Sequence, residues 1–62
     1  MDNKEKLIQA IVNNNFDEAK AVAFTLISTL DDGDTVEEVL NNTKEYKDTV
    51  SYKIVEKMLK YM

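Results

Sequence analysis

The residue types best suited to chemistry gather in one acidic stretch, Asp31-Asp32-Gly33-Asp34, near the middle of the chain. Carboxylates beside a glycine are typical of calcium loops, in which oxygen ligands alternate and a glutamate occupies the twelfth position. Here the glycine comes third, and the twelfth position is Asn42. The ligand spacing is not met, so we expect a helix stop and a helix start here instead of a metal site.

Two further pairs of carboxylates, Asp17-Glu18 and Glu37-Glu38, have the composition of an acid–base pair. General acid–base catalysis needs groups positioned on the reacting atoms of one substrate. Neighbouring residues on a helix point about 100° apart, so these pairs do not converge. Acidic residues in a first helical turn stabilise the positive end of the helix dipole. We therefore interpret both pairs as helix-start signals.

The chain contains no His, Cys, Arg, Trp or Pro, and the absence of His and Cys removes the commonest nucleophilic and metal-binding side chains. Without His and Cys it lacks the commonest general base, the thiol nucleophile, the usual zinc ligands and all disulfides. Ser28 has no lysine within a helical turn, and Ser51 lies four residues from Lys47, an ordinary spacing on a helix surface. We expect no enzymatic activity, no cofactor and no metal.

Length and charge limit the remaining classes of protein. The 62 residues form one helical domain, 1–62, and carry eight basic against twelve acidic side chains, a net charge of −4. So short a chain buries only about 60% of its unfolded surface, which favours association, and we expect a protein partner or a homo-oligomer. Nucleic acids and anionic membranes reward clustered basic residues, so neither is expected. The longest apolar run, Ala21–Phe24, is too short for a membrane span or a signal peptide, which predicts a cytoplasmic protein.

Apolar residues recur at helical spacing, which predicts an all-α fold: a small bundle of three or four helices starting with an antiparallel α-hairpin. Asn13-Asn14-Asn15 is expected to end the first helix and cap the second. Gly33 is expected to end the second helix, and Thr35 with Glu38 to form a capping box at the start of the third. The predicted helices span about 4–13, 16–30, 35–42 and 44–61.

The second half of the chain leaves one alternative open. A single apolar stripe at helical spacing continues from Val36 through Tyr46 to Tyr61 and is compatible with one long helix. Asn41-Asn42-Thr43 are weak helix formers that readily act as caps, and they favour a break into two helices.

Five apolar residues exceed what one small core needs and are the candidate partner-binding residues. Phe24 falls outside the arc of its helix, and Tyr52 points away from the stripe and is expected to be exposed. Three residues of the last helix, Val55, Leu59 and Met62, drift off the stripe. The full set of candidate partner-binding residues is Phe24, Tyr52, Val55, Leu59 and Met62. The alternative is that a four-helix arrangement buries them; otherwise they form an interface patch.

One segment is similar to a known family. Leu7-Ile8-Gln9-Ala10-Ile11, followed by Asn15-Phe16-Asp17-Glu18-Ala19-Lys20 and by Phe24, resembles part of the prohead core (internal scaffold) proteins of large tailed phages. The likeness covers residues 7–24. It implies a small phage protein that acts by assembly and not by catalysis.

These observations lead to one expected function and two alternatives. We expect a non-catalytic protein–protein interaction module, such as a small phage-encoded inhibitor or adaptor that binds a host protein in the host cytoplasm. The first alternative is a self-assembling prohead core or scaffold component. The second is a binder of a small anionic, nucleotide-like ligand at an oligomer interface.

Overall fold

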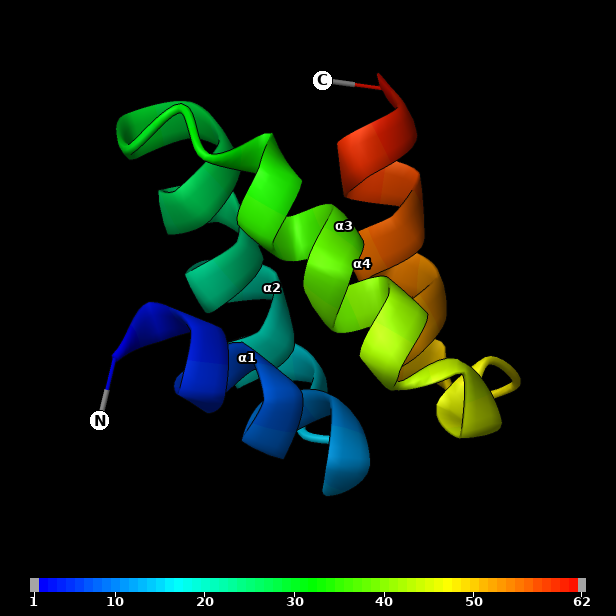
Figure 1. The fold of residues 1–62 in the computed structure, drawn as a ribbon. Coiled ribbons are helices and arrows are strands. Elements are labelled where there is room, and N and C mark those ends of the chain that lie inside the picture. The colour runs from blue at the N-terminus through cyan, green and yellow to red at the C-terminus, as the bar shows by residue number, and fades with distance from the viewer. Residues whose placement is uncertain (1, 62) are drawn as a thin grey trace.

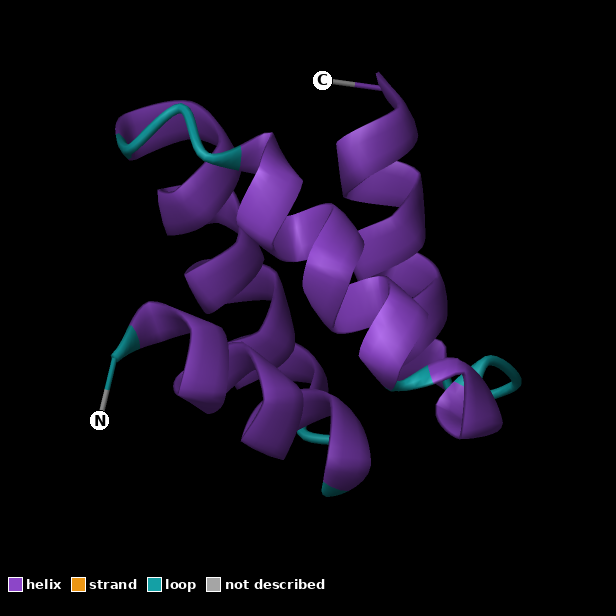
Figure 2. Cartoon of the chain, in the orientation of Figure 1, coloured by secondary structure: helices purple, strands orange, loops and turns teal. Residues whose placement is uncertain are grey.

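Four α-helices build the fold, and the computed structural model describes residues 2–61. In chain order the elements are α1 (Asn3–Val12), α2 (Phe16–Phe24), the π-helical segment η1 (Thr25–Thr29), α3 (Gly33–Asn42), the 3-10 turn η2 (Lys44–Tyr46) and α4 (Val50–Tyr61). No strand occurs within the described residues (Figure 2). The predicted all-α bundle is confirmed.

The helices pack around one apolar core. α1 and α2 pack on each other and run in opposite directions, α2 also packs on α4, and α3 contacts both α1 and α4 (Figure 1). Small residues on α2, Ala19 and Ala23, are fully buried and let its neighbours approach closely. The core residues with no exposed surface are Leu7, Ile11, Ala19, Ala23, Val36, Val39 and Val55.

The turn between α1 and α2 follows the prediction from its asparagines. Asn14 adopts a left-handed conformation, with φ of 51°, which Asn tolerates better than most residues. The Asn15 side chain then caps α2 by accepting a hydrogen bond from the Glu18 N–H at 3.4 Å. At the start of α1, Asp2 accepts a hydrogen bond from the Glu5 N–H at 2.9 Å.

The second predicted helix changes its hydrogen-bond pattern before it ends. From Thr25 onward the turns widen, and the Leu30 N–H donates to the Thr25 carbonyl, five residues earlier, at 2.9 Å. The Thr25 Oγ1 also donates to the Ala21 carbonyl at 3.1 Å, a back-bond that often bends helices. The predicted helix 16–30 is therefore α-helical to Phe24 and π-helical from Thr25 to Thr29.

The prediction for the turn before α3 is wrong in its details. Asp31, not Gly33, takes the left-handed conformation, with φ of 51°. Asp32 caps α3: its carboxylate accepts hydrogen bonds from the Thr35 N–H at 3.2 Å and from the Thr35 Oγ1 at 2.7 Å. Gly33 is the first residue of α3, and Thr35 does not start the helix as a capping box. A carboxylate that receives two hydrogen bonds from one threonine outcompetes that threonine as a cap.

The predicted break in the second half is present, but it is longer than expected. α3 ends at Asn42, and the Thr43 hydroxyl, which is buried, donates to the Val39 carbonyl at 2.7 Å. α4 begins at Val50 and not at residue 44, because residues 43–49 form η2 and a turn.

The first turn of α4 is capped from two places in the chain. The Thr49 Oγ1 accepts a hydrogen bond from the Tyr52 N–H at 3.2 Å, as a local cap does. The Ser51 N–H donates instead to the Asn14 Oδ1 at 3.1 Å, across 37 residues of sequence. The turn of the first hairpin therefore satisfies a backbone donor of the last helix.

Candidate functional site: a groove between α2 and α4

Two of the five candidate partner-binding residues are buried. Tyr52 is only 6% exposed, and its hydroxyl donates to the Leu40 carbonyl at 3.2 Å. Burial, with a smaller contribution from the negative charge of Glu56, raises the pKa of Tyr52 above its ordinary value. Val55 has no exposed surface. The expectation that Tyr52 is exposed is wrong, because it anchors α4 to α3.

The other three candidates have different environments. Leu59 is half-buried beside the start of α3, where its Cδ1 lies 3.4 Å from the place a Cβ on Gly33 would take. Met62 lies outside the described residues. Phe24 is 52% exposed in the middle of the described chain, in agreement with its position outside the apolar arc of α2.

A change of helical phase explains the errors on α4. The predicted stripe ran in one phase from α3 into α4 and placed Tyr61 in the core, yet Val50 and Tyr61 are 58% and 71% exposed. Residues 43–49 are not α-helical, so α4 begins in a new phase and turns Ser51, Tyr52 and Val55 inward.

The exposed phenylalanine lies in a hollow of about 420 Å³ between α2 and α4, which we call the apolar groove. Ala21 and Phe24 on α2 and Met58 on α4 supply its apolar surface. Ala21 is exposed and small, so an incoming side chain can approach the α2 backbone closely. The full lining is Asp17, Lys20, Ala21, Phe24, Thr25 and Met58.

Polar groups lie at the edges of the apolar groove. The Lys20 ammonium sits 6.0 Å from the centroid of the Phe16 ring, within the range of a cation–π contact. The Thr25 hydroxyl is already bonded to the Ala21 carbonyl. An apolar centre with charged edges is the arrangement of protein-docking surfaces, which have a dry core and a polar rim.

The polar groups that line the groove are one carboxylate, Asp17, one ammonium, Lys20, and one hydroxyl, Thr25. Within residues 2–61, no group of three His, Cys, Asp or Glu side chains is placed to hold a metal ion. The pKa of Lys4 is raised by its hydrogen bond and charge interaction with Glu38, but this exposed pair, like Tyr52, does not line the groove.

Comparison with known proteins assigns no relative to the chain. No known family model matches it, and neither curated protein sequences nor solved structures give a significant match. None of the helices described between residues 2 and 61 combines the length and apolar character that a membrane span requires.

Of the six groove residues only Phe24 was a predicted site residue; of the two apolar residues that were missed, Ala21 and Met58, only Ala21 had a signal in the sequence. Ala21 lies three residues before Phe24 and one after Lys20, so the outward stripe of α2 contained it. Met58 was assigned to the core stripe of the last helix, and it does pack, partly buried, against the core, but it also lines the groove beside α2.

Proposed function

We propose that this protein is a non-catalytic protein-interaction module that binds a partner in the apolar groove. The observation that carries the proposal is Phe24: a large aromatic side chain, 52% exposed, in a hollow that Ala21 and Met58 line. Aromatic residues in apolar pockets are the typical anchors of protein interfaces. The finer expectation, a phage-encoded inhibitor or adaptor, is one form of this function and stays a prediction.

The exposure pattern supports a specific surface. Other large apolar side chains are exposed at or near helix ends, such as Val12, Leu30 and Val50, where neighbouring helices no longer cover them. Phe24 instead lies within a continuous run of helical residues, next to a second helix. Burying a phenylalanine stabilises a complex by roughly 1.5–3 kcal/mol. Because Phe24 is 52% exposed, an occupant of the groove can gain about half of that energy.

The test is the selection of ligands from a displayed library of helical peptides, with the wild-type chain, Phe24→Ala and Leu30→Ala as targets. Leu30 is a matched control, because it is 53% exposed and does not line the groove. We expect peptides with apolar anchors to bind the wild-type chain and Leu30→Ala alike, and Phe24→Ala at least about tenfold more weakly. Ligands that bind all three targets equally, or no enrichment at all, would contradict the proposal.

A further inference from the structure

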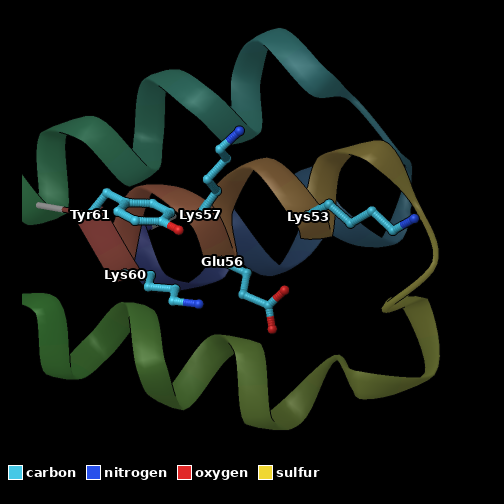
Figure 3. A pocket seen from close by; sticks show the side chains of 5 residues that line it. All are labelled: Lys53, Glu56, Lys57, Lys60 and Tyr61. Atoms are coloured by element: carbon cyan, nitrogen blue, oxygen red, sulfur yellow. The ribbon is translucent and has the colours of Figure 1, made fainter.

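A row of exposed lysines lies on the outer face of α4. Lys53, Lys57 and Lys60, which we call the lysine stripe, follow the i, i+4, i+7 spacing of one helix face. With Glu56 and Tyr61 they line a shallow hollow of about 430 Å³ (Figure 3). The single ion pair among the described residues joins Lys4 and Glu38, so no ion pair within the described chain neutralises the stripe.

The lysine stripe adjoins the apolar groove along one edge. Met58, the α4 residue of the groove, directly follows Lys57, and Tyr61 lies one helical turn beyond both. In Figure 3 the Lys57 side chain extends toward the side on which α2 lies, whereas Glu56 extends toward α3. The groove-side edge of α4 therefore presents a positive charge, and the acidic residue of the stripe's hollow is turned away from it.

The rest of the chain carries the opposite charge. Residues 1–43 contain nine acidic residues and three lysines, which gives this segment a net charge of −6. Residues 44–62 contain three acidic residues and five lysines, which gives a net charge of +2. On α2, Asp17 lines the groove and Glu18 follows it. On α2 the groove-lining Asp17 and Lys20 carry opposite charges, so a bound partner meets both signs along α2 and an excess of positive charge only along α4.

Resting on the proposed function, we infer that the occupant is an amphipathic helix that carries apolar anchors for the groove and carboxylates along the flank facing α4. α2 and α4 pack side by side, and a third helix fits the groove between two packed helices. Asp17 to Thr25 span about 12 Å at 1.5 Å per residue, which matches apolar anchors at i, i+4 and i+7. Complementary charge along one flank fixes the orientation of the bound helix and speeds its association.

Nucleic acid is the other polyanion that a lysine stripe attracts, and the residues around the stripe disfavour it. The chain has no arginine, Glu56 lies within the hollow, and the adjoining groove is apolar. Phosphate backbones reward basic residues and gain nothing from an apolar groove.

The experiment uses the full chain and a displayed library of helical peptides with all surface positions randomised. We expect the selected peptides to share apolar anchors and to be enriched in Asp and Glu on one flank only. The affinity of one selected peptide, labelled with a fluorophore, is then measured by anisotropy at low and high salt. Replacing its flanking carboxylates with Lys tests the charge contact without any change to the protein.

Two variants of the chain separate a local contact from net charge. The stripe variant removes the three charges of the lysine stripe by Lys53→Gln, Lys57→Gln and Lys60→Gln. The control variant removes three charges outside both hollows by Lys6→Gln, Lys44→Gln and Lys47→Gln. We expect the stripe variant to bind the acidic peptide about tenfold more weakly at low salt, which corresponds to about 1.4 kcal/mol. The control variant should change the affinity less than threefold, and the difference should shrink at high salt.

The outcomes distinguish this inference from the proposed function. Selected peptides with apolar anchors but no acidic flank, or equal affinities for the two triple variants, would overturn the inference and leave the proposed function standing. No apolar anchors at all would overturn both. Binding of a labelled 20-nucleotide single strand that only the stripe variant loses, or a homodimer that only the stripe variant dissociates, would also overturn the inference.

Discussion

The hydrogen bond between Asn14 and the first turn of α4 gives a quantitative prediction about stability. In Asn14→Gly the left-handed backbone is retained at no steric cost, but the acceptor for the Ser51 N–H is lost. Loss of a helix cap costs about 0.5–2 kcal/mol, and typically about 1. Asn14 already has a Cβ in the left-handed region, so Asn14→Ala loses the acceptor and also the short polar side chain that lets Asn tolerate this conformation, and it should cost more than Asn14→Gly.

These losses are large for so small a protein. At 0.05–0.15 kcal/mol per residue, a 62-residue chain has a free energy of unfolding of about 3–9 kcal/mol. Each kcal/mol lowers the melting temperature by about 4–8 °C. We therefore expect Asn14→Gly to lower Tm by about 4–8 °C, and Asn14→Ala to lower it further. Asn14→Asp keeps an acceptor at the positive end of a helix and should remain near the wild type at pH 7.

The assay is urea unfolding followed by circular dichroism, combined with hydrogen exchange of the Ser51 amide. Asn13→Ala is the control, because Asn13 is exposed in an ordinary helical conformation, and it should change the free energy of unfolding by less than about 0.5 kcal/mol. In Asn14→Gly the Ser51 amide should exchange faster. If Asn14→Gly and Asn14→Ala unfold at the same urea concentration as the Asn13→Ala control, or if exchange of the Ser51 amide in Asn14→Gly is unchanged, the cap contributes nothing and the reasoning is refuted.

Three other residues give shorter predictions. Ser51→Ala should raise Tm, because the buried Ser51 hydroxyl has no hydrogen-bond partner within residues 2–61 and its desolvation costs about 1–3 kcal/mol; a lower Tm in a thermal melt would contradict this. Tyr52→Phe should cost about 0.5–1.5 kcal/mol at pH 7 through loss of the hydrogen bond to Leu40. Above pH 10 the unfolded state loses the Tyr52 proton before the folded state does, because burial raises the pKa of Tyr52 in the fold. The free energy of unfolding therefore falls as pH rises, by at most about 1.4 kcal/mol per unit, and this fall should be shallower in Tyr52→Phe. Glu38→Gln should leave Tm unchanged in the same melts, because its ion pair with Lys4 is exposed.

The sequence predicted well what depends on local residue preferences. The asparagine turn, the N-cap at Asn15 and the end of α3 at Asn42 follow from side chains that bond to nearby backbone groups. Phe24 was placed outside the core by its angle on the helical wheel, because α2 keeps a regular phase up to that residue. Local rules were enough for these features.

Other features depended on contacts that span the fold. The phase of α4 is set by residues 43–49 and by the packing of Tyr52 on Leu40, so a wheel drawn from α3 assigned Tyr61 to the core. The acidic turn contains several carboxylates that could cap α3. Asp32 is the one that does so, because its carboxylate lies within hydrogen-bond distance of Thr35. The apolar groove needs Met58 beside α2, a contact between distant parts of the chain that no local pattern specifies.

The π-helical segment also has a consequence for how the chain tolerates changes in length. A π-turn contains one residue more than an α-turn, so Thr25–Thr29 contains one residue that a regular α-helix over the same length would not have. Removing one residue from the exposed positions Ser28 or Thr29 lets the segment close into an α-helix without moving α2 or Phe24. An equivalent deletion within α3 rotates every following side chain by about 100°. We therefore expect η1 to accept a single-residue deletion more readily than α3 does.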